Sequence, residues 1–165
     1  MREALAGMQG GVPGANWVDP ENFHVTLRFI GEVPENRIAD IDETLAEVSG
    51  KPFALSLTGM DSFSRGHEPI SLWAGVEKSE ALMALQKRID QALTRAGYPT
   101  DEKRYTPHVT LARLHRPDEA RVAGFIAEHN LFRAEPFMAE QFTLFSSHLT
   151  SEGAHYAPEA DYRLG

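Results

Sequence analysis

The chain has 165 residues and no cysteine, so disulfide bonds, thiolate metal sites and thiol nucleophiles are excluded. Its 16 basic and 24 acidic side chains give a net charge of −8, which disfavours a surface that coats nucleic acid without specificity. No stretch approaches the ~18 apolar residues of a membrane span, and the N-terminus lacks the apolar core of a signal peptide. We therefore expect a cytoplasmic protein that contacts no membrane.

The first half of the chain alternates helical and strand-like patterns. Residues 2–9 form a short helical pattern that ends at a pair of glycines, and residues 24–27 are typical of a strand. Residues 34–48 begin with a proline, which is favoured in the first turn of a helix, and carry apolar side chains at helical spacing. The run 52–57 is again typical of a strand.

The second half contains a similar series of elements. Residues 70–76 alternate like a strand, and Ser79 is suited to cap a helix that ends near Gly97. A strand-like run at 108–111 is followed by a helical pattern behind Pro117 and by a further strand at 142–145.

The tetrapeptide His-Val-Thr-Leu stands at the same place in both series, at residues 24–27 and 108–111. Each copy follows a helix and precedes a second helix and a strand. We therefore predict an α+β fold of two similar lobes, built from repeats at about 1–62 and 69–147 with a C-terminal segment at 148–165. A pseudo-two-fold axis would set the two tetrapeptide strands side by side.

The strand expected at 70–76 has no counterpart in the first repeat. A sheet that lacks a strand exposes the N–H and C=O groups of its edge. We expect a C-terminal segment, such as residues 155–164, or a neighbouring molecule to cover that edge. Pro158 would confine the C-terminal segment to an edge position.

The alternation of a strand turns the histidine and the threonine of each tetrapeptide toward one face, and the valine and leucine toward the core. Two imidazoles in one site suit in-line displacement at phosphorus, because one removes a proton from water while the other protonates the leaving oxygen. The hydroxyls of Thr26 and Thr110 can donate to the phosphate oxygens. A single copy would be weak evidence, whereas two copies at matching positions are much stronger.

The segments at 22–33 and 105–113 resemble the paired motifs of the two-histidine phosphoesterases. Within that superfamily the chain is most similar to the bacterial RNA 2′,3′-cyclic phosphodiesterases, also called 2′–5′ RNA ligases. The resemblance implies a bilobal fold with mainly antiparallel sheets and a central cleft. It also implies metal-independent hydrolysis of terminal 2′,3′-cyclic phosphates of RNA to 2′-phosphates, or the reverse reaction as 2′–5′ ligation. His24 would be the proton donor and His108 the proton acceptor.

Three further residues are candidates for substrate contact. Arg113 matches an arginine that the family places after its second motif, where it is expected to hold phosphate. Strict alternation would turn Arg113 away from His108, so the strand must end, bulge or twist for this match to hold. Arg28 is spaced evenly with His24 and Thr26, so in a strand it would share their face. It could line the cleft, or be a polar residue near its rim. Tyr105 could stack on a terminal base.

Other classes of function remain open at this point. A metalloenzyme could combine the histidines with Glu21, Glu32, Asp101 or Glu102, although neither motif carries a carboxylate at short ligand spacing. A non-catalytic RNA-end binder could keep the same cleft. The substrate could also be a 2′–5′ oligonucleotide or a small cyclic nucleotide. We expect the binding partners to be RNA ends or cyclic nucleotides. We expect no cofactor and no obligate protein partner.

Overall fold

The computed structural model describes residues 1–100 and 102–165. Asp101, one of the carboxylates considered as a metal ligand, lies outside the described residues. The chain divides into two compact units. Unit 1 comprises Met1–Thr26, Leu55–Lys78 and Tyr105–Phe137. Unit 2 comprises Leu27–Ala54, Ser79–Arg104 and Met138–Gly165.

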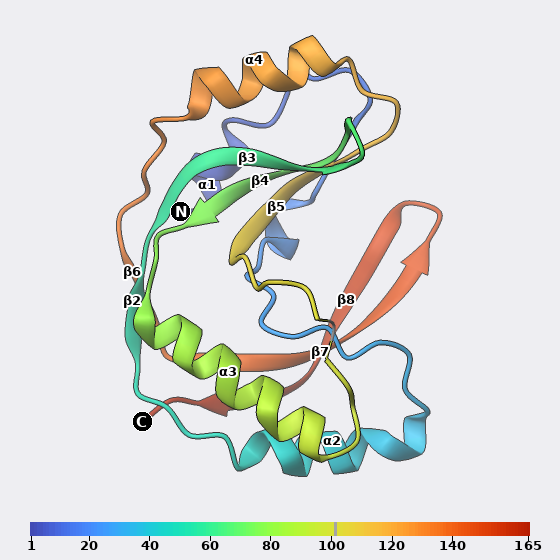
Figure 1. Ribbon diagram of the computed structural model, residues 1–165, viewed down its shortest axis with the longest axis vertical. Coiled ribbons are helices and arrows are strands. Elements are labelled where there is room, and N and C mark those ends of the chain that lie inside the picture. Colours follow the sequence, from blue (N-terminus) through green and yellow to red (C-terminus); the bar gives the residue numbers. More distant parts are fainter. Residues whose placement is uncertain (101) are drawn as a thin grey trace. The chain divides into compact units, whose positions relative to one another are not determined.

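Unit 1 is built on an antiparallel four-stranded sheet with the strand order β1-β5-β4-β3. Its strands are β1 (Ala15–Trp17), β3 (Leu57–Arg65), β4 (Glu68–Val76) and β5 (His108–Leu114). Its helical elements are α1 (Arg2–Ala6), the 3-10 turn η1 (Pro20–Asn22) and α4 (Glu119–His129). In Figure 1, α4 lies along this sheet.

The core of unit 1 lies between α4 and one face of its sheet. The carboxylate of Asp118 accepts hydrogen bonds from the first backbone N–H groups of α4 and so fixes where this helix begins. The helix buries Val122 and Phe125, and the ring of Phe125 contacts that of Trp17. Val109 and Leu111 of β5 are buried as well, so the opposite face of β5 carries its histidine and its threonine.

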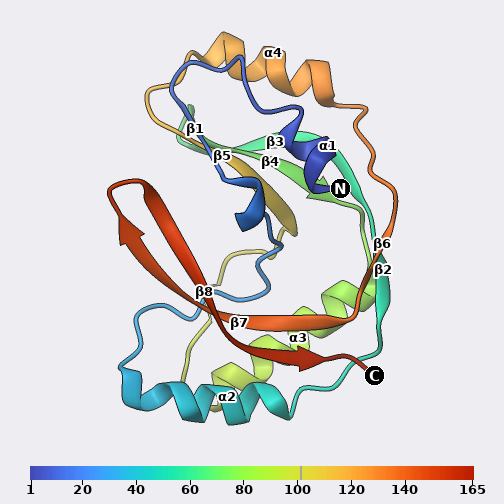
Figure 2. The same cartoon turned by 180° about the vertical axis from the view of Figure 1, so that it is seen from behind.

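Unit 2 places helices against a long two-stranded hairpin. Its elements are η2 (Glu35–Arg37), α2 (Ile38–Ala46), α3 (Glu80–Arg95), β7 (Gln141–Thr150) and β8 (Gly153–Arg163). Figure 2 shows the β7–β8 hairpin from behind. The hydroxyl of Ser79 accepts from the N–H of Leu82, as the capping pattern predicted. The apolar faces of both helices join the hairpin in one core: Ile41, Leu45, Leu85, Ile89, Leu93, Phe142, Tyr162 and Leu164.

Two short strands, β2 (Phe53–Leu55) and β6 (Phe137–Ala139), pair where the chain crosses between the units. Each unit takes elements from both predicted repeats, since α1 and α4 belong to unit 1 while α2 and α3 belong to unit 2. The predicted combination of helices with mainly antiparallel sheets is confirmed. No helix among the described residues is long and apolar enough to cross a membrane.

The prediction of a strand at the first tetrapeptide is wrong. Within 23–34, Val25 alone takes part in ladder pairing, through an isolated bridge, and residues 26–34 form neither helix nor strand. The C-terminal segment is a strand, as expected, but β8 pairs along its length with β7. Among the described residues β8 forms no backbone pair with the first tetrapeptide, so it does not act there as the missing strand.

Candidate functional site

The second tetrapeptide lies in strand β5 and pairs along one edge with β4. In β5, His108 lies opposite Gly75 of β4 and Thr110 lies opposite Trp73, so these four residues share one face of the sheet. Val109 is buried on the other face, while His108 and Thr110 are half-buried. The sheet therefore holds the imidazole and the hydroxyl at fixed positions on the face opposite α4.

The first tetrapeptide meets the second at one point. Val25 forms an antiparallel bridge with Val109. In an antiparallel pair the residues next to these valines also lie opposite each other. Thr26 therefore lies opposite His108, and His24 lies opposite Thr110. The hydroxyl of Tyr105 donates a 2.9 Å hydrogen bond to the backbone carbonyl of Thr26 and ties the two segments together a second time. The two motifs are therefore neighbours within unit 1.

Both histidines are held in the same way. Nδ1 of His24 lies 2.6 Å from the carbonyl oxygen of Asn22, and Nδ1 of His108 lies 2.7 Å from that of Thr106. A carbonyl oxygen can only accept, so Nδ1 carries the proton in each hydrogen bond. Nε2 is consequently the nitrogen through which each ring would exchange a proton with a substrate.

An aromatic cluster surrounds the second histidine. The ring of His108 lies 4.9 Å from that of Phe63, edge to face, and 5.4 Å from that of Trp73. Phe63 and Trp73 also contact each other at 4.9 Å. These neighbours could not be predicted from the sequence, because a strand pattern at 70–76 does not reveal which side chains of the adjacent strand will lie beside it. The cluster restricts the orientations that the His108 ring can take.

Arg113 lies on the same face as His108 because β5 carries a bulge. The register runs from Thr110 opposite Trp73 to Ala112 opposite Leu72, so Leu111 is an extra residue in β5. Arg113 then lies opposite Ser71, which shares a face of β4 with Trp73. The departure from strict alternation that the Arg113 match required is therefore present.

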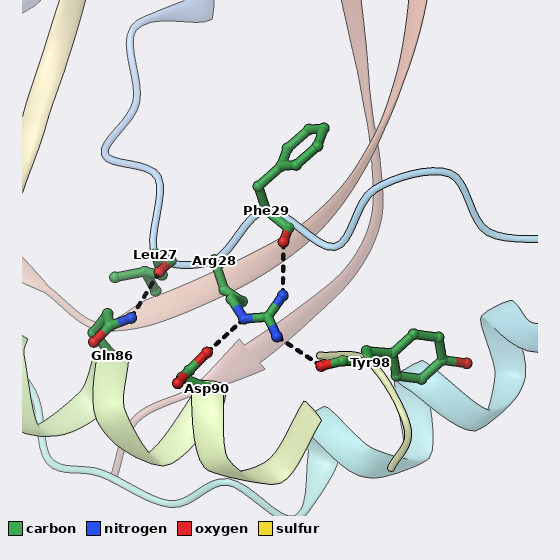
Figure 3. Close-up of polar contacts among 6 residues, drawn as sticks. All are labelled: Leu27, Arg28, Phe29, Gln86, Asp90 and Tyr98. Atoms are coloured by element: carbon green, nitrogen blue, oxygen red, sulfur yellow. Dashed lines mark hydrogen bonds and ion pairs between the residues drawn. The ribbon is translucent and has the colours of Figure 1, made fainter. Parts of the chain in front are cut away.

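Arg28, in contrast, makes its hydrogen bonds within unit 2, and its place in a substrate cleft stays a prediction. Its Nε donates to Asp90 at 2.6 Å, and its terminal nitrogens donate at 2.7 Å to the carbonyls of Phe29 and Tyr98 (Figure 3). The side chain is 6% exposed. The Nε2 of Gln86 also donates to the carbonyl of Leu27. Three of the five N–H groups of Arg28 are thus engaged within unit 2, and its nearly buried side chain offers little surface to a phosphate.

The ionisation of these groups follows from their surroundings. Burial opposes the charge on Asp90, but the hydrogen bonds from Arg28 and Thr100 and the positive charge of Arg28 outweigh it and lower the pKa of Asp90. Burial raises the pKa of Tyr105 to about 12, so its hydroxyl stays a donor toward Thr26 over the physiological range. The hydroxyl of Tyr105 is thereby committed to the backbone, which makes Tyr105 a link between the two motifs.

The described residues contain no group of three His, Cys, Asp or Glu side chains arranged to hold a metal ion. Glu21 and Glu32, the described carboxylates nearest in sequence to the first motif, are both exposed. The metalloenzyme alternative thus has no ligand cluster to support it among these residues.

Residues 14–150 match the family model described as the 2′-5′ RNA ligase superfamily. The RNA 2′,3′-cyclic phosphodiesterase of Archaeoglobus fulgidus is 34% identical over 146 residues, which cover 88% of this chain and 82% of that protein. The protein of the same name from Thermotoga maritima is 36% identical, over 87% of this chain and 76% of its own length.

Solved structures with the same fold cover almost the whole chain. A crystal structure of a Thermus thermophilus protein has a TM-score of 0.82 at 23% identity and covers 98% of this chain and 90% of its own. LigT of E. coli, crystallised with 3′-AMP, has a TM-score of 0.78 at 21% identity and covers 99% and 90%. At these identities the likeness concerns the fold alone.

Proposed function

The chain belongs to the 2′-5′ RNA ligase superfamily, and on that premise we propose that it hydrolyses terminal 2′,3′-cyclic phosphates of RNA to 2′-phosphates without a metal ion. The observation that carries the proposal is the Val25–Val109 bridge between two His-x-Thr segments whose histidines both hold Nδ1 on a backbone carbonyl. In this proposal both rings would act on one substrate through Nε2, with His24 protonated on both nitrogens and His108 on Nδ1 alone. The names of the relatives support the choice of substrate.

In the proposed reaction His108 acts as the base and His24 as the acid. Nε2 of His108 takes a proton from water as the water oxygen bonds to phosphorus. The bond from phosphorus to O3′ breaks, and O3′ takes the proton that Nε2 of His24 carries. The product is a 2′-phosphate with a free 3′-hydroxyl, and both histidines return to their starting states when protons exchange with solvent. The reverse sequence would join an RNA end through a 2′–5′ linkage.

The polar groups beside the histidines would stabilise the charge that builds on the phosphate. Thr26 and Thr110 lie in the same two segments and carry hydroxyl donors, and Arg113 adds a guanidinium on the face of Thr110. Donors that are held in place before the reaction stabilise a developing charge more effectively than water does. In this proposal the aromatic cluster around His108 and the hydroxyl of Tyr105 act as positioning groups.

A substrate panel tests the proposal directly. Purified protein is incubated with RNA that ends in a 2′,3′-cyclic phosphate, with mononucleoside 2′,3′-cyclic phosphates and with 2′–5′ oligonucleotides, and the products are assigned by phosphorus NMR. We expect 2′-phosphate products, unchanged rates in EDTA and a bell-shaped pH profile, because one histidine must be neutral and the other charged.

The other outcomes of the panel separate the alternatives. Binding without turnover would identify a non-catalytic RNA-end binder. Loss of activity in EDTA that zinc restores would identify a metalloenzyme. A 3′-phosphate product would overturn the assignment of O3′ as the leaving group, and cleavage of 2′–5′ oligonucleotides alone would redirect the substrate class.

A further inference from the structure

An aromatic ring is exposed to solvent directly beside the second histidine. The ring centre of Phe63, on β3, lies 4.9 Å from that of His108 and 4.9 Å from that of Trp73, and 36% of the residue is exposed. Trp73 itself is only 9% exposed. Because Trp73 packs against one side of the Phe63 ring, the area that Phe63 leaves to solvent lies on the opposite side and the rim. A molecule that binds at His108 therefore meets an apolar ring.

Trp73 supports this ring although its own indole N–H is poorly accommodated. The Nε1 of Trp73 is buried and has no hydrogen-bond acceptor among the described residues. A buried donor without a partner destabilises the folded state, so an apolar side chain without that N–H would be the more stable choice at this position. What the indole supplies is its contact with both Phe63 and His108. The cluster thus fixes the position of two rings at the expense of some stability.

Phe63 is also the aromatic side chain of this cluster that is free to contact a ligand. Tyr105, the side chain first considered for base stacking, donates its hydroxyl to the carbonyl of Thr26 and links the two motifs. Phe63 carries no polar group, so its ring offers only a π surface. Its neighbours in β3, Asp61 and Ser64, are exposed and polar, so the ring stands out as an apolar spot on a polar surface.

The chemistry of a 2′,3′-cyclic nucleotide directs its base toward the side of His108. The phosphate joins O2′ and O3′, and the base is carried by C1′, which is bonded to C2′. In the proposed reaction O3′ is directed at His24 as the leaving group. C1′ is separated from C3′ by C2′, so the base is turned away from His24. Phe63 is the exposed ring beside the other histidine.

We propose that the exposed ring of Phe63 stacks on the nucleobase of the terminal nucleotide. Every base has a π face, so such a platform accepts all four bases and favours the larger purines. It makes the protein recognise a nucleotide, and not merely a cyclic phosphodiester. This inference deepens the proposed function and rests on it, because it assigns the cyclic phosphate to His24 and His108.

The kinetic test compares adenosine 2′,3′-cyclic phosphate with the 2′,3′-cyclic phosphate of methyl riboside, which has no base. We expect kcat/KM of the wild type to be about 10-fold higher for the adenosine compound, the size of one base–aromatic stack. Phe63→Ala should bring this ratio close to one, and Phe63→Tyr should keep it. Phe137→Ala is the matched control, because it removes a ring of similar exposure, 39%, from β6 and should leave the ratio unchanged.

Two results would overturn the platform. One is a wild-type ratio near one. The other is a Phe63→Ala variant that slows both substrates by the same factor, which would show that Phe63 acts only by positioning His108.

A binding test separates this proposal from the proposed function. Calorimetry compares adenosine 2′-phosphate with the 2-phosphate of methyl riboside on the wild type and on the same variants. A gain in affinity from the base that Phe63→Ala removes and Phe63→Tyr retains supports the platform even if no cyclic phosphate is hydrolysed. Equal affinities overturn the platform even if hydrolysis proceeds.

Discussion

The same tetrapeptide adopts two different local structures in this chain. His108–Leu111 opens the regular strand β5, which has β4 on one side and β1 on the other. His24–Leu27 forms a single bridge, at Val25, and the chain then passes from unit 1 to unit 2 between Thr26 and Leu27. Beyond that point, Leu27 and Arg28 are bonded to groups of unit 2.

This comparison shows that a strand depends on its neighbours more than on its own residues. β4 pairs with β5 between His108 and Arg113, and β1 pairs with it from Ala112 to Leu114, so the bulge at Leu111 is accommodated within a continuous strand. The first segment has the same residues but lacks two flanking strands. It is held by point contacts instead, namely one bridge and the hydroxyl of Tyr105. The identical arrangement of both imidazoles on i−2 carbonyls survives this difference.

The largest expected effect is the loss of either histidine. If the two segments carry equivalent proton-transfer groups, His24→Ala and His108→Ala should each reduce kcat by about 10²–10⁴-fold. Each variant should also lose one limb of the bell-shaped pH profile, and the limb that is lost reports whether that histidine is the acid or the base. His67→Ala, in the exposed turn between β3 and β4, is the control. A variant at either motif with full activity would remove that histidine from the mechanism.

The next effect concerns the ion pair between Arg28 and Asp90, which anchors the chain just after the first segment. Asp90→Asn removes the charge that faces a nearly buried guanidinium, so we expect a loss of about 2 kcal/mol in the free energy of unfolding. Asp40→Asn is the matched control, because its ion pair with Arg37 is exposed on both sides and should contribute close to nothing. Urea unfolding followed by circular dichroism measures both. Equal effects would show that the Arg28 bonds do not anchor the segment.

The lowered pKa of Asp90 predicts how the stability contributed by this ion pair changes at acidic pH. Because the folded state holds the carboxylate ionised, its stabilisation is present above the ordinary pKa of an aspartate and is lost as the pH falls below it. The wild type should therefore lose stability on acidification more steeply than Asp90→Asn. Identical acid curves for the two proteins would contradict the assigned shift.

A smaller effect is expected where Tyr105 ties the two segments together. Tyr105→Phe removes the hydrogen bond to Thr26, which should let the first segment move and reduce kcat by about 10-fold, with a modest loss of stability. Tyr162→Phe is the matched control, since its hydroxyl donates to Asp42 in unit 2 and its loss should lower stability without changing kcat. Equal kcat values for the two variants would show that Tyr105 does not position the motif.

The raised pKa values of the same two tyrosines predict that the protein loses folding stability at alkaline pH. The pKa of Tyr105 is raised to about 12 by burial, and that of Tyr162 is raised by burial and by Asp42. A folded state that retains the phenol proton more tightly than the unfolded state loses stability as the pH rises beyond about 10. Unfolding measured between pH 9 and 12 should show this decline, and Tyr105→Phe should reduce its slope.

Much of the fold could be predicted because helical periodicity and capping are local. The helix that begins after Ser79 and the strands at 70–76 and 108–111 needed no knowledge of the rest of the chain. The alternation of side chains along a strand also showed that the strand must end, bulge or twist before Arg113 for that residue to share a face with His108. The structural role of Arg28, the aromatic neighbours of His108 and the hydrogen bond of Tyr105 could not be predicted, because each depends on a partner that is distant in sequence.

The smallest effect comes from the two valines that join the motifs. Val109 is 5% exposed and lies in the core of unit 1, whereas Val25 is half-buried on an isolated bridge. Truncation removes more buried surface and leaves a larger cavity at the fully buried site. We expect Val109→Ala to cost about 2 kcal/mol of unfolding free energy and Val25→Ala about 1 kcal/mol or less. Because the bridge aligns the motifs, Val25→Ala should nevertheless lower kcat more than its small stability loss suggests. Urea unfolding and initial rates on both variants decide the matter: if Val25→Ala costs as much stability as Val109→Ala, the first segment is held as firmly as β5 and the contrast between the two motifs is lost.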